Sequence, residues 1–329
     1  MATEATTRPL SDQDLRDLGF GAVVSRESRQ RLLNRDGSFN VERRGLGFWS
    51  SFSAYHLMLT MPWWAFFAIA AAMYLAVNGL FAAAYIACGP DALSGLLGSD
   101  TVGMERHLYM RAFFFSVQTL STIGYGHIVP VGTAANTVVA VEALIGLFGF
   151  AIVTGLLFAR FSRPSAKVVF SSHALIAPYQ GMTAFEFRVA NARSNELIEV
   201  SAKVLVSRFE QVDGIHTRRY YPLSLERPGV VFLPLTWTVV HPIDEKSPLF
   251  GETAESLKNA QAEFLVLLSA FDETFSTIVH TRTSFVSEEV KWGYRFASAF
   301  LSTKGRRNKV AVDMRQFDRF ERATLTLER

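Results

Sequence analysis

Cysteine is almost absent, since Cys88 is the one cysteine among 329 residues. A single cysteine excludes both a disulfide-stapled fold and a thiolate metal cluster, because each needs more than one thiol. Enzyme signatures are also missing: the chain has no Gly-x-Ser-x-Gly elbow, His-Glu-x-x-His pair, Walker loop or dinucleotide fingerprint. The sequence therefore predicts no enzyme, no resident cofactor and no nucleic-acid partner.

Charged side chains are missing from two long stretches. None occurs between Arg44 and Asp91, and between Arg111 and Arg160 the sole one is Glu142. Each stretch contains an apolar run longer than the roughly 20 residues that a helix needs to span a bilayer. We therefore predict an outer transmembrane helix at residues 61–88 and an inner one at residues 133–162.

Basic residues flank both predicted spans on the same side. Arg43 and Arg44 precede the first span, and Arg160, Arg163 and Lys167 lie at or beyond the end of the second. The positive-inside rule then places both termini of a multi-pass membrane protein in the cytoplasm. The polar first 40 residues lack the apolar core of a secretory signal.

The residues before the first span have their own pattern. Residues 1–45 form a polar N-terminal segment, whereas residues 46–60 place Phe48, Phe52, Tyr55 and Leu59 at helical spacing, with serines on the other side. This pattern predicts an interfacial helix on the cytoplasmic membrane surface. An extension of the first span is the alternative.

Residues 163–329 differ in character from the rest. Short alternating runs at 185–189, 200–206, 237–240 and 264–268 are separated by turn signals such as Gln180-Gly181 and Pro228-Gly229. They predict a cytoplasmic, antiparallel, all-β domain of the immunoglobulin-like sandwich type. The charge-rich end, residues 304–329, is expected to be a solvated face or tail.

The loop between the spans, residues 89–132, contains a segment too short to cross the membrane again. Residues 109–121 fit a half-helix, and Thr122-Ile123-Gly124-Tyr125-Gly126 is the extended part that follows. Non-helical backbone at membrane depth is tolerated where it is buried in protein or lines a water-filled path. We therefore predict a re-entrant pore helix and a selectivity filter at residues 122–126.

The residue types in this filter suit K⁺. Successive carbonyls that replace the water shell of a dehydrated ion must point the same way, which requires backbone of alternating handedness, and Gly124 and Gly126 make the left-handed steps cheap. The Thr122 hydroxyl adds an inner ligand, and Ile123 and Tyr125 brace the ring from behind. K⁺ is thus expected at residues 122–125. Each chain supplies a quarter of each ring, so function demands a homotetramer.

Several motifs in one order resemble the inward rectifier potassium channels, especially their prokaryotic members. Besides the filter they comprise Phe158-Ala-Arg-Phe-Ser-Arg-Pro164, Val169-Phe-Ser-Ser-His-Ala174, Arg188-Val-Ala-Asn-Ala-Arg193, Trp237-Thr-Val-Val-His-Pro-Ile-Asp-Glu-Lys-Ser-Pro-Leu249 and Trp292-Gly-Tyr-Arg-Phe296. The resemblance implies a two-span pore of the bacterial inner membrane, a slide helix at residues 46–60 and a cytoplasmic domain that extends the pore.

The resemblance also implies roles along the inner helix. Phe158 matches the aromatic gate at the helix-bundle crossing, and a ring of four phenyl groups excludes water from a pore; helix packing is the alternative. Phe150 and Thr154 match pore-lining positions. Three glycines are hinge candidates, which the sequence does not rank: Gly146, Gly149 and Gly155.

Arg160, Arg163 and Lys167 match a basic cluster that binds anionic lipid, and the resemblance predicts phosphoinositide sensitivity. Enforcing the orientation of the spans is the plainer reading of these residues, and both readings can hold together.

Three departures from the family pattern bear on regulation. Phe150 stands where strong rectifiers carry a carboxylate, so block by Mg²⁺ or polyamines would need a cytoplasmic acid, for which Glu273 is the candidate and Asp272 a weaker one. Gln118 replaces a glutamate behind the filter, and Glu142 is a compensating carboxylate that faces either pore-helix packing or water. His127, after the filter, is either a pH-sensitive group or a plain surface residue.

A channel is not the sole reading of these features. A membrane-tethered β-sandwich that binds a partner would also have two spans and a β domain. Stoichiometry discriminates the two, because a pore requires a fourfold ring and a tether does not.

Overall fold

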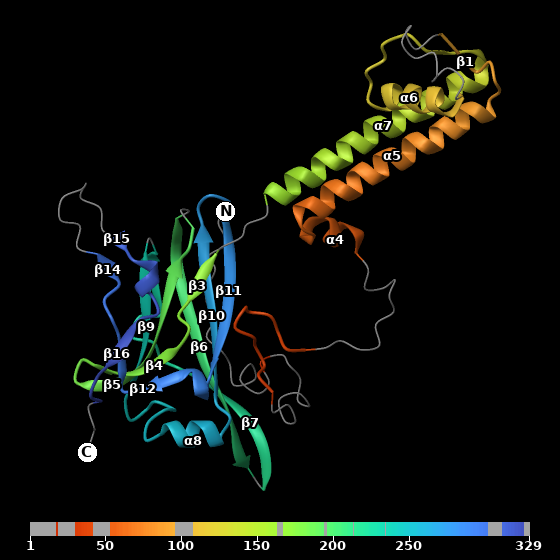
Figure 1. Ribbon diagram of the computed structural model, residues 1–329. Coiled ribbons are helices and arrows are strands. Elements are labelled where there is room, and N and C mark those ends of the chain that lie inside the picture. Colours follow the sequence, from red (N-terminus) through yellow and green to blue (C-terminus); the bar gives the residue numbers. More distant parts are fainter. Residues whose placement is uncertain are drawn as a thin grey trace, which may run out of the picture. The chain divides into compact units, whose positions relative to one another are not determined.

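The computed structural model describes residue 18 and residues 30–41, 53–95, 108–162, 167–193, 196–212, 214–233, 235–301 and 311–325. The chain divides into two compact units (Figure 1). Residues 45–163 form the membrane unit, and residues 1–44 together with 164–329 form the β unit. The β unit is therefore discontinuous in sequence.

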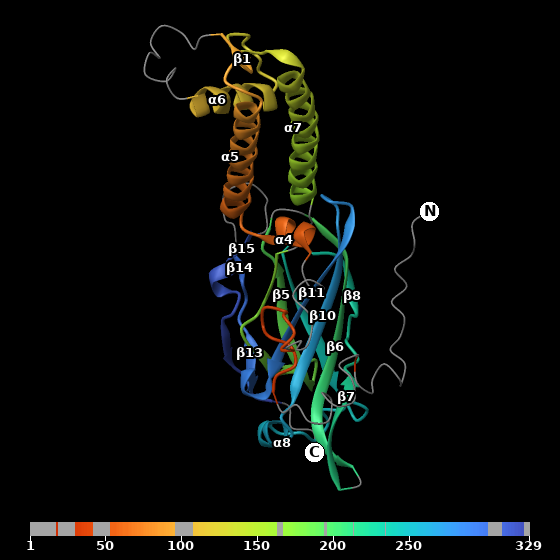
Figure 2. The same cartoon turned by 90° about the vertical axis from the view of Figure 1, so that its right-hand side faces the viewer.

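The membrane unit is built on two long apolar helices, α5 (Trp63–Ala87) and α7 (Gly132–Phe161), which run side by side (Figure 2). Both are long and apolar enough to cross a membrane. The shorter α6 (Leu108–Leu120) packs against both, and β1 (Leu93–Ser94) pairs with β2 (Val129–Pro130) beside it. Helices satisfy their own backbone groups, which is required where no water is available.

Burial in α7 is the reverse of that in a soluble helix. The buried residues of this 30-residue helix are Ala135, Glu142 and Arg160, so it buries both of its ionisable residues and leaves most of its apolar ones exposed. Lipid or further copies of the chain must cover such a surface in solution. This pattern supports the predicted membrane location.

A short helix precedes the first long one. α4 (Ala54–Thr60) begins at Ser53, whose side chain accepts a hydrogen bond from the His56 N–H, and it ends where Met61 and Pro62 adopt extended backbone. The break makes α4 a separate helix rather than an extension of α5. Residues 46–52 of the predicted interfacial helix lie outside the described residues.

The β unit contains two five-stranded sheets among the described residues. One comprises β6 (Leu197–Val212), β7 (Ile215–Pro222), β8 (Gly229–Phe232), β10 (Glu263–Asp272) and β11 (Thr277–Val286). The other comprises β3 (Val168–Phe170), β4 (Ala174–Tyr179), β5 (Met182–Asn191), β9 (Thr236–Ile243) and β12 (Val290–Trp292).

The core lies between these sheets. Phe185 of β5 stacks on Phe264 of β10 with ring centroids 4.3 Å apart, and both are almost fully buried. Alternate residues of β5 face the core, as the period-two pattern predicts. The predicted sandwich is confirmed, although one strand pair, β12 with β4, is parallel.

The other face of β5 is covered by the C-terminal part of the chain. Arg188 donates to the carbonyl of Phe317 (3.2 Å) and to that of Ala297 (2.6 Å). β13 (Tyr294–Phe296) pairs with β16 (Phe320–Arg322), and β14 (Phe300–Leu301) pairs with β15 (Ala311–Val312). Residues 311–325 are therefore attached to the β unit through Phe317 and two strand pairs, while Arg315, Asp318, Arg319, Glu321 and Arg322 stay exposed. Of the two expectations, a solvated face fits this segment and a free tail does not.

Candidate ion pore

The segment after α6 is tied to the end of that helix. The N–H groups of Ile123 and Gly124 donate to the carbonyl of Gln118 (2.8 and 3.3 Å). The Thr122 N–H donates to the backbone carbonyl of Thr119 (3.0 Å). The helix end thus fixes the first residues of the extended segment. Gln118, the departure noted in the sequence, contributes its backbone oxygen to this tie.

Every second residue of the segment has left-handed backbone. The φ angle is +57° at Thr122, +59° at Gly124 and +79° at Gly126. Glycine adopts these angles at little cost, whereas a β-branched residue such as threonine is strained by about 1–3 kcal/mol. The alternation was predicted from the two glycines; the left-handed Thr122 was not, because threonine gives no sign of it.

The carbonyl groups of this segment are available to a ligand. No hydrogen bond among the described residues ends on a carbonyl oxygen of residues 122–126. Ile123 and Tyr125 are 49% and 69% exposed in the single chain. Bracing of the ring by these two side chains would need contacts with other copies of the chain, so this role stays a prediction.

Glu142 lies in the interior of the membrane unit, beside α5 and α6. Its side chain is fully buried and contacts the Tyr85 hydroxyl of α5 and the Ser116 hydroxyl of α6. Of the two orientations left open by the sequence, the structure supports pore-helix packing. His127 is exposed. Whether it is a pH-sensitive group or a plain surface residue stays a prediction.

The three inner-helix glycines differ in their surroundings. A Cβ atom added at Gly146 would lie 2.6 Å from the Leu120 carbonyl oxygen, whereas nothing lies within 4 Å of one added at Gly149 or Gly155. Gly146 therefore permits close packing of α7 on the end of the pore helix. The assignment of a hinge stays a prediction.

The predicted gate and pore-lining residues are exposed in the single chain. Phe158 is 72% and Phe150 is 76% exposed, and Thr154 is exposed as well. This exposure is what a residue facing the axis of a ring of copies requires, but the single chain does not test it. All three roles stay predictions.

Arg160 is held by protein groups. Its guanidinium donates to the carbonyls of Met58 and Met61 (2.7 Å for the latter) at the end of α4. It also lies over the rings of Trp63 and Phe66, 4.4 and 4.9 Å from their centroids. Arg160 thus joins the end of the inner helix to α4 and to the start of α5.

The other two members of the predicted lipid cluster lie outside the described part of the membrane unit. Arg163 lies outside the described residues, and Lys167 belongs to the β unit, where it is exposed. Lipid binding by the three residues stays a prediction.

The acids at the turn between β10 and β11 differ in burial. Asp272 is fully buried and accepts a hydrogen bond from the Thr274 N–H (2.9 Å), which fits a turn-forming role. Glu273 is exposed and leaves its carboxylate to solvent. Among the described residues, no group of His, Cys, Asp and Glu side chains has the arrangement of a metal site.

Sequence reasoning missed the role of residues 30–41, here called the N-terminal strap. The Glu263 carboxylate accepts the N–H groups of Leu32 (2.9 Å) and Leu33 (3.1 Å) and pairs with Arg218 at 3.3 Å, both charged side chains being 2% exposed. Leu32 and Leu33 are themselves buried against Tyr220 and Leu265. The strap is therefore an integral part of the β unit.

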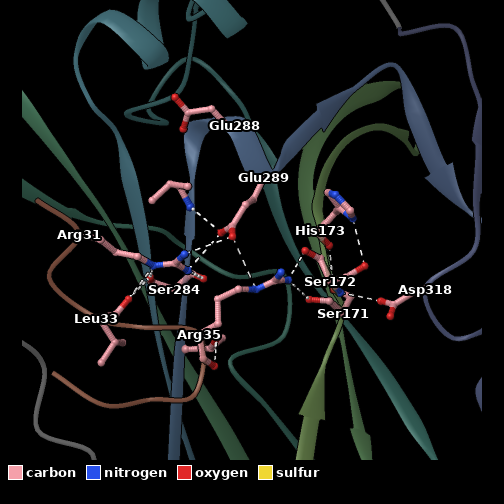
Figure 3. Close-up of polar contacts among 12 residues, drawn as sticks. Arg31, Leu33, Arg35, Ser171, Ser172, His173, Ser284, Glu288, Glu289 and Asp318 are labelled. Atoms are coloured by element: carbon pink, nitrogen blue, oxygen red, sulfur yellow. Dashed lines mark hydrogen bonds and ion pairs between the residues drawn. The ribbon is translucent and has the colours of Figure 1, made fainter. Parts of the chain in front are cut away.

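Arginines of the strap extend this contact (Figure 3). Arg31 pairs with Glu289 at 3.1 Å and donates to Ser284, and Arg35 lies 3.6 Å from the same Glu289 carboxylate. Arg282 of β11 donates to the Gly37 carbonyl (2.6 Å). Arginine and leucine in a polar N-terminal segment were the available signal, and the sequence analysis assigned them no role.

Two buried groups of the β unit titrate away from their ordinary ranges. Burial raises the pKa of Glu186 on β5 to about 7, although nearby Arg188 acts in the opposite direction. Burial lowers the pKa of His241, whose Nδ1 lies 2.6 Å from the Ser224 carbonyl and whose Nε2 lies 2.8 Å from the Ser247 hydroxyl. Neither was predicted from the sequence.

Comparison with known families covers both units. The family described as "Inward rectifier potassium channel C-terminal domain" matches residues 168–327, and the family described as "Ion channel" matches residues 73–163. The division between the two matches falls where the two units meet in sequence.

Individual relatives agree with these matches. "Inward rectifier potassium channel Kirbac3.1" of Paramagnetospirillum magnetotacticum is 41% identical over 301 residues, covering 90% of this chain and 98% of that protein. "ATP-sensitive inward rectifier potassium channel 8" of Mus musculus is 29% identical, covering 78% of this chain and 61% of its own length. "Inward rectifier potassium channel 18" of Homo sapiens is 29% identical, covering 65% and 51%.

Proposed function

This chain belongs to the inward rectifier potassium channel family, and from that premise we propose that four copies form a K⁺-selective pore through residues 122–126. The family consists of ion channels rather than enzymes, and K⁺ is the permeant ion rather than a cofactor. The observation that carries the proposal is the left-handed backbone at Thr122, Gly124 and Gly126 together with carbonyls that no described hydrogen bond occupies.

Four copies are needed because one chain contributes one wall of the pore. The family is generally tetrameric, and the exposure of Tyr125, Phe150 and Phe158 is consistent with faces that meet copies or the pore axis. A closed ring of four identical walls gives each ion a complete cage of carbonyl oxygens.

Gating is proposed at Phe158, two residues before Arg160. Because Arg160 binds the last carbonyls of α4, a shift of that helix along the membrane surface moves the end of α7 and with it the Phe158 ring. Anionic lipid, including phosphoinositide, is the proposed ligand of Arg160, Arg163 and Lys167. Glu273 is the proposed site at which Mg²⁺ or polyamines would block the cytoplasmic pore.

The protein is a membrane protein, and we propose that it crosses the membrane twice with both termini in the cytoplasm. The strap before the first span and the strands after the second belong to one compact unit, so both lie in one compartment. That supports an even number of crossings, as do the two apolar helices.

Cation flux into liposomes tests the function. Purified protein should take up K⁺ and Rb⁺ but not Na⁺, uptake should stop with Ba²⁺, and Gly124→Asp should abolish it. Native mass spectrometry should give four copies. Uptake of Na⁺ equal to that of K⁺ would contradict the filter. A monomer or dimer without flux in anionic or neutral lipid would favour the membrane-tethered binding module.

A further inference from the structure

A line of polar side chains crosses the membrane unit from the inner helix to the filter. It contains six residues of α5, α6, α7 and the α6–filter junction: Tyr74, Asn78, Tyr85, Ser116, Ser121 and Glu142. Asn78, Ser116 and Glu142 are fully buried. Polar groups buried inside a membrane unit are costly unless each forms a hydrogen bond. Assigning one hydrogen atom to each of these bonds therefore shows which groups must be protonated.

The amide orientation of Asn78 is set by its neighbours. Its Nδ2 donates to the Tyr74 carbonyl at 2.7 Å, which an amide oxygen in that place would repel. Its Oδ1 therefore faces the Ser116 hydroxyl, 2.9 Å away, and accepts the proton of that hydroxyl.

Ser116 then has no proton left for Glu142. The Ser116 oxygen also contacts Glu142 Oε1, and a hydroxyl carries a single proton. One hydrogen is missing between these two oxygens unless the carboxyl group supplies it. Tyr85 donates to the other oxygen, Oε2, so the missing proton belongs on Oε1.

Within the described part of the chain, Glu142 has no cationic partner. None of the ion pairs among the described residues includes it. An ionised carboxylate without a cation in a fully buried site is strongly disfavoured, whereas a neutral acid that donates one hydrogen bond and accepts another is satisfied.

The line ends at the filter. Ser121, the residue before Thr122, has its hydroxyl 2.6 Å from the Tyr74 hydroxyl. Glu142 therefore holds α6 to α7 through Ser116, and Asn78 ties Ser116 to α5. The side chain of Tyr74, one turn earlier on α5, separately holds the last residue before the filter.

We propose that Glu142 is a neutral, protonated carboxylic acid that positions the pore helix and the base of the filter through Ser116. Because it would act on the filter through Ser116 of α6, it is a positioning residue. The expected effect on conduction rests on the proposed channel function. The protonation of Glu142 does not depend on that function.

Infrared spectroscopy tests the protonation directly. The difference spectrum of wild type minus Glu142→Gln, at neutral pH in liposomes, should contain the C=O band of a protonated carboxyl group, with a small downshift in D₂O. Ser116→Ala should move that band to higher frequency, because the acid loses the acceptor of its proton. A difference spectrum with carboxylate bands alone would overturn the proposal.

Flux measurements test the positioning. Glu142→Gln keeps the size, one acceptor and one donor, so its K⁺ over Na⁺ selectivity should stay within about threefold of wild type. Glu142→Ala should lose at least about tenfold in selectivity while still forming tetramers. Equal selectivity in both variants would overturn the positioning role. An absence of flux in wild type would instead count against the channel function, and the infrared result would stand apart from it.

Discussion

At the residue scale, Glu186 is a carboxyl group that burial keeps partly protonated near neutral pH. It lies on the outer face of β5 and is 8% exposed, and burial raises its pKa from an ordinary 4.5 to about 7. A raised pKa means that the folded state binds the proton more tightly than the unfolded state. The stabilisation is fully present below about pH 4.5 and is lost once the pH has risen through about 7.

Glu186→Gln should therefore remove a pH dependence. Wild type should lose up to about 3 kcal/mol of stability between pH 4.5 and pH 8, and the variant should lose markedly less. Unfolding of the full chain by urea, followed across this pH range, measures the difference. Glu245→Gln, which changes an exposed carboxylate, is the control. Parallel wild-type and Glu186→Gln curves would contradict the assignment.

Some single-residue features of the pore could be predicted from the sequence and others could not. Gly124 and Gly126 predicted the alternating backbone, because glycine is the residue that adopts a left-handed φ at the lowest cost. Thr122 shares that conformation without such a signal, because its backbone is set by the end of α6. Glu142 was identified as an intramembrane acid, but its partners come from two other helices and no local pattern reveals them.

At the element scale, the contact between α7 and the end of α6 depends on one glycine. Gly146→Ala would bring a methyl group to 2.6 Å from the Leu120 carbonyl oxygen, so α7 would have to move away from the pore helix. Overpacking of this kind costs roughly 1–3 kcal/mol. We expect lower thermal stability of the tetramer and lower K⁺ selectivity in flux assays.

Gly149→Ala is the matched control, because nothing in the chain lies within 4 Å of its added methyl group. Its stability should equal that of wild type or exceed it by up to about 1 kcal/mol, since alanine favours helix. The contact argument fails if both variants behave alike.

The strap is a second element whose attachment can be tested. Glu263→Gln leaves the buried Arg218 without its carboxylate and weakens the acceptor of two backbone N–H groups, and breaking a buried pair costs about 3–5 kcal/mol. Trypsin should then cleave after Arg31 and Arg35 faster than in wild type, as followed by mass spectrometry. Glu288→Gln, an exposed change nearby, should leave the rate unchanged; equal acceleration by both would refute the clamp.

Helices and strands that arise from a local sequence pattern could be predicted, whereas features that arise from contacts between distant residues could not. Apolar length indicated α5 and α7, and period-two alternation indicated β5 and β9 of one sheet and β6 and β10 of the other. The parallel pairing of β12 with β4 and the packing of residues 311–325 follow from tertiary contacts, such as Arg188 with Phe317. The strap has neither a long apolar run nor period-two alternation. Its backbone is held instead by Glu263, Arg218 and Arg282, which lie on strands far away in the sequence.

At the scale of the whole molecule, the discontinuous β unit makes a prediction about sidedness. Cysteines placed at exposed Ser38 and Gln180, each in a Cys88→Ser background, should react with a membrane-impermeant maleimide from the same side of sealed vesicles. The native Cys88, at the far end of α5, should react from the other side. Labelling of S38C and Q180C from opposite sides would contradict an even number of crossings.

The docking of the strap on Glu263 and Glu289 also has a consequence for biosynthesis. Residues 30–41 leave the ribosome early, whereas the strands that hold them are made only after α5 and α7. The β unit therefore cannot close until the intervening membrane unit has been threaded so that its two ends face one compartment. If α5 and α7 both cross the membrane, as proposed, a chain in which one of them is not inserted would keep the strap and its strands on opposite sides. Leu32 and Leu33 would then stay exposed to quality-control proteases.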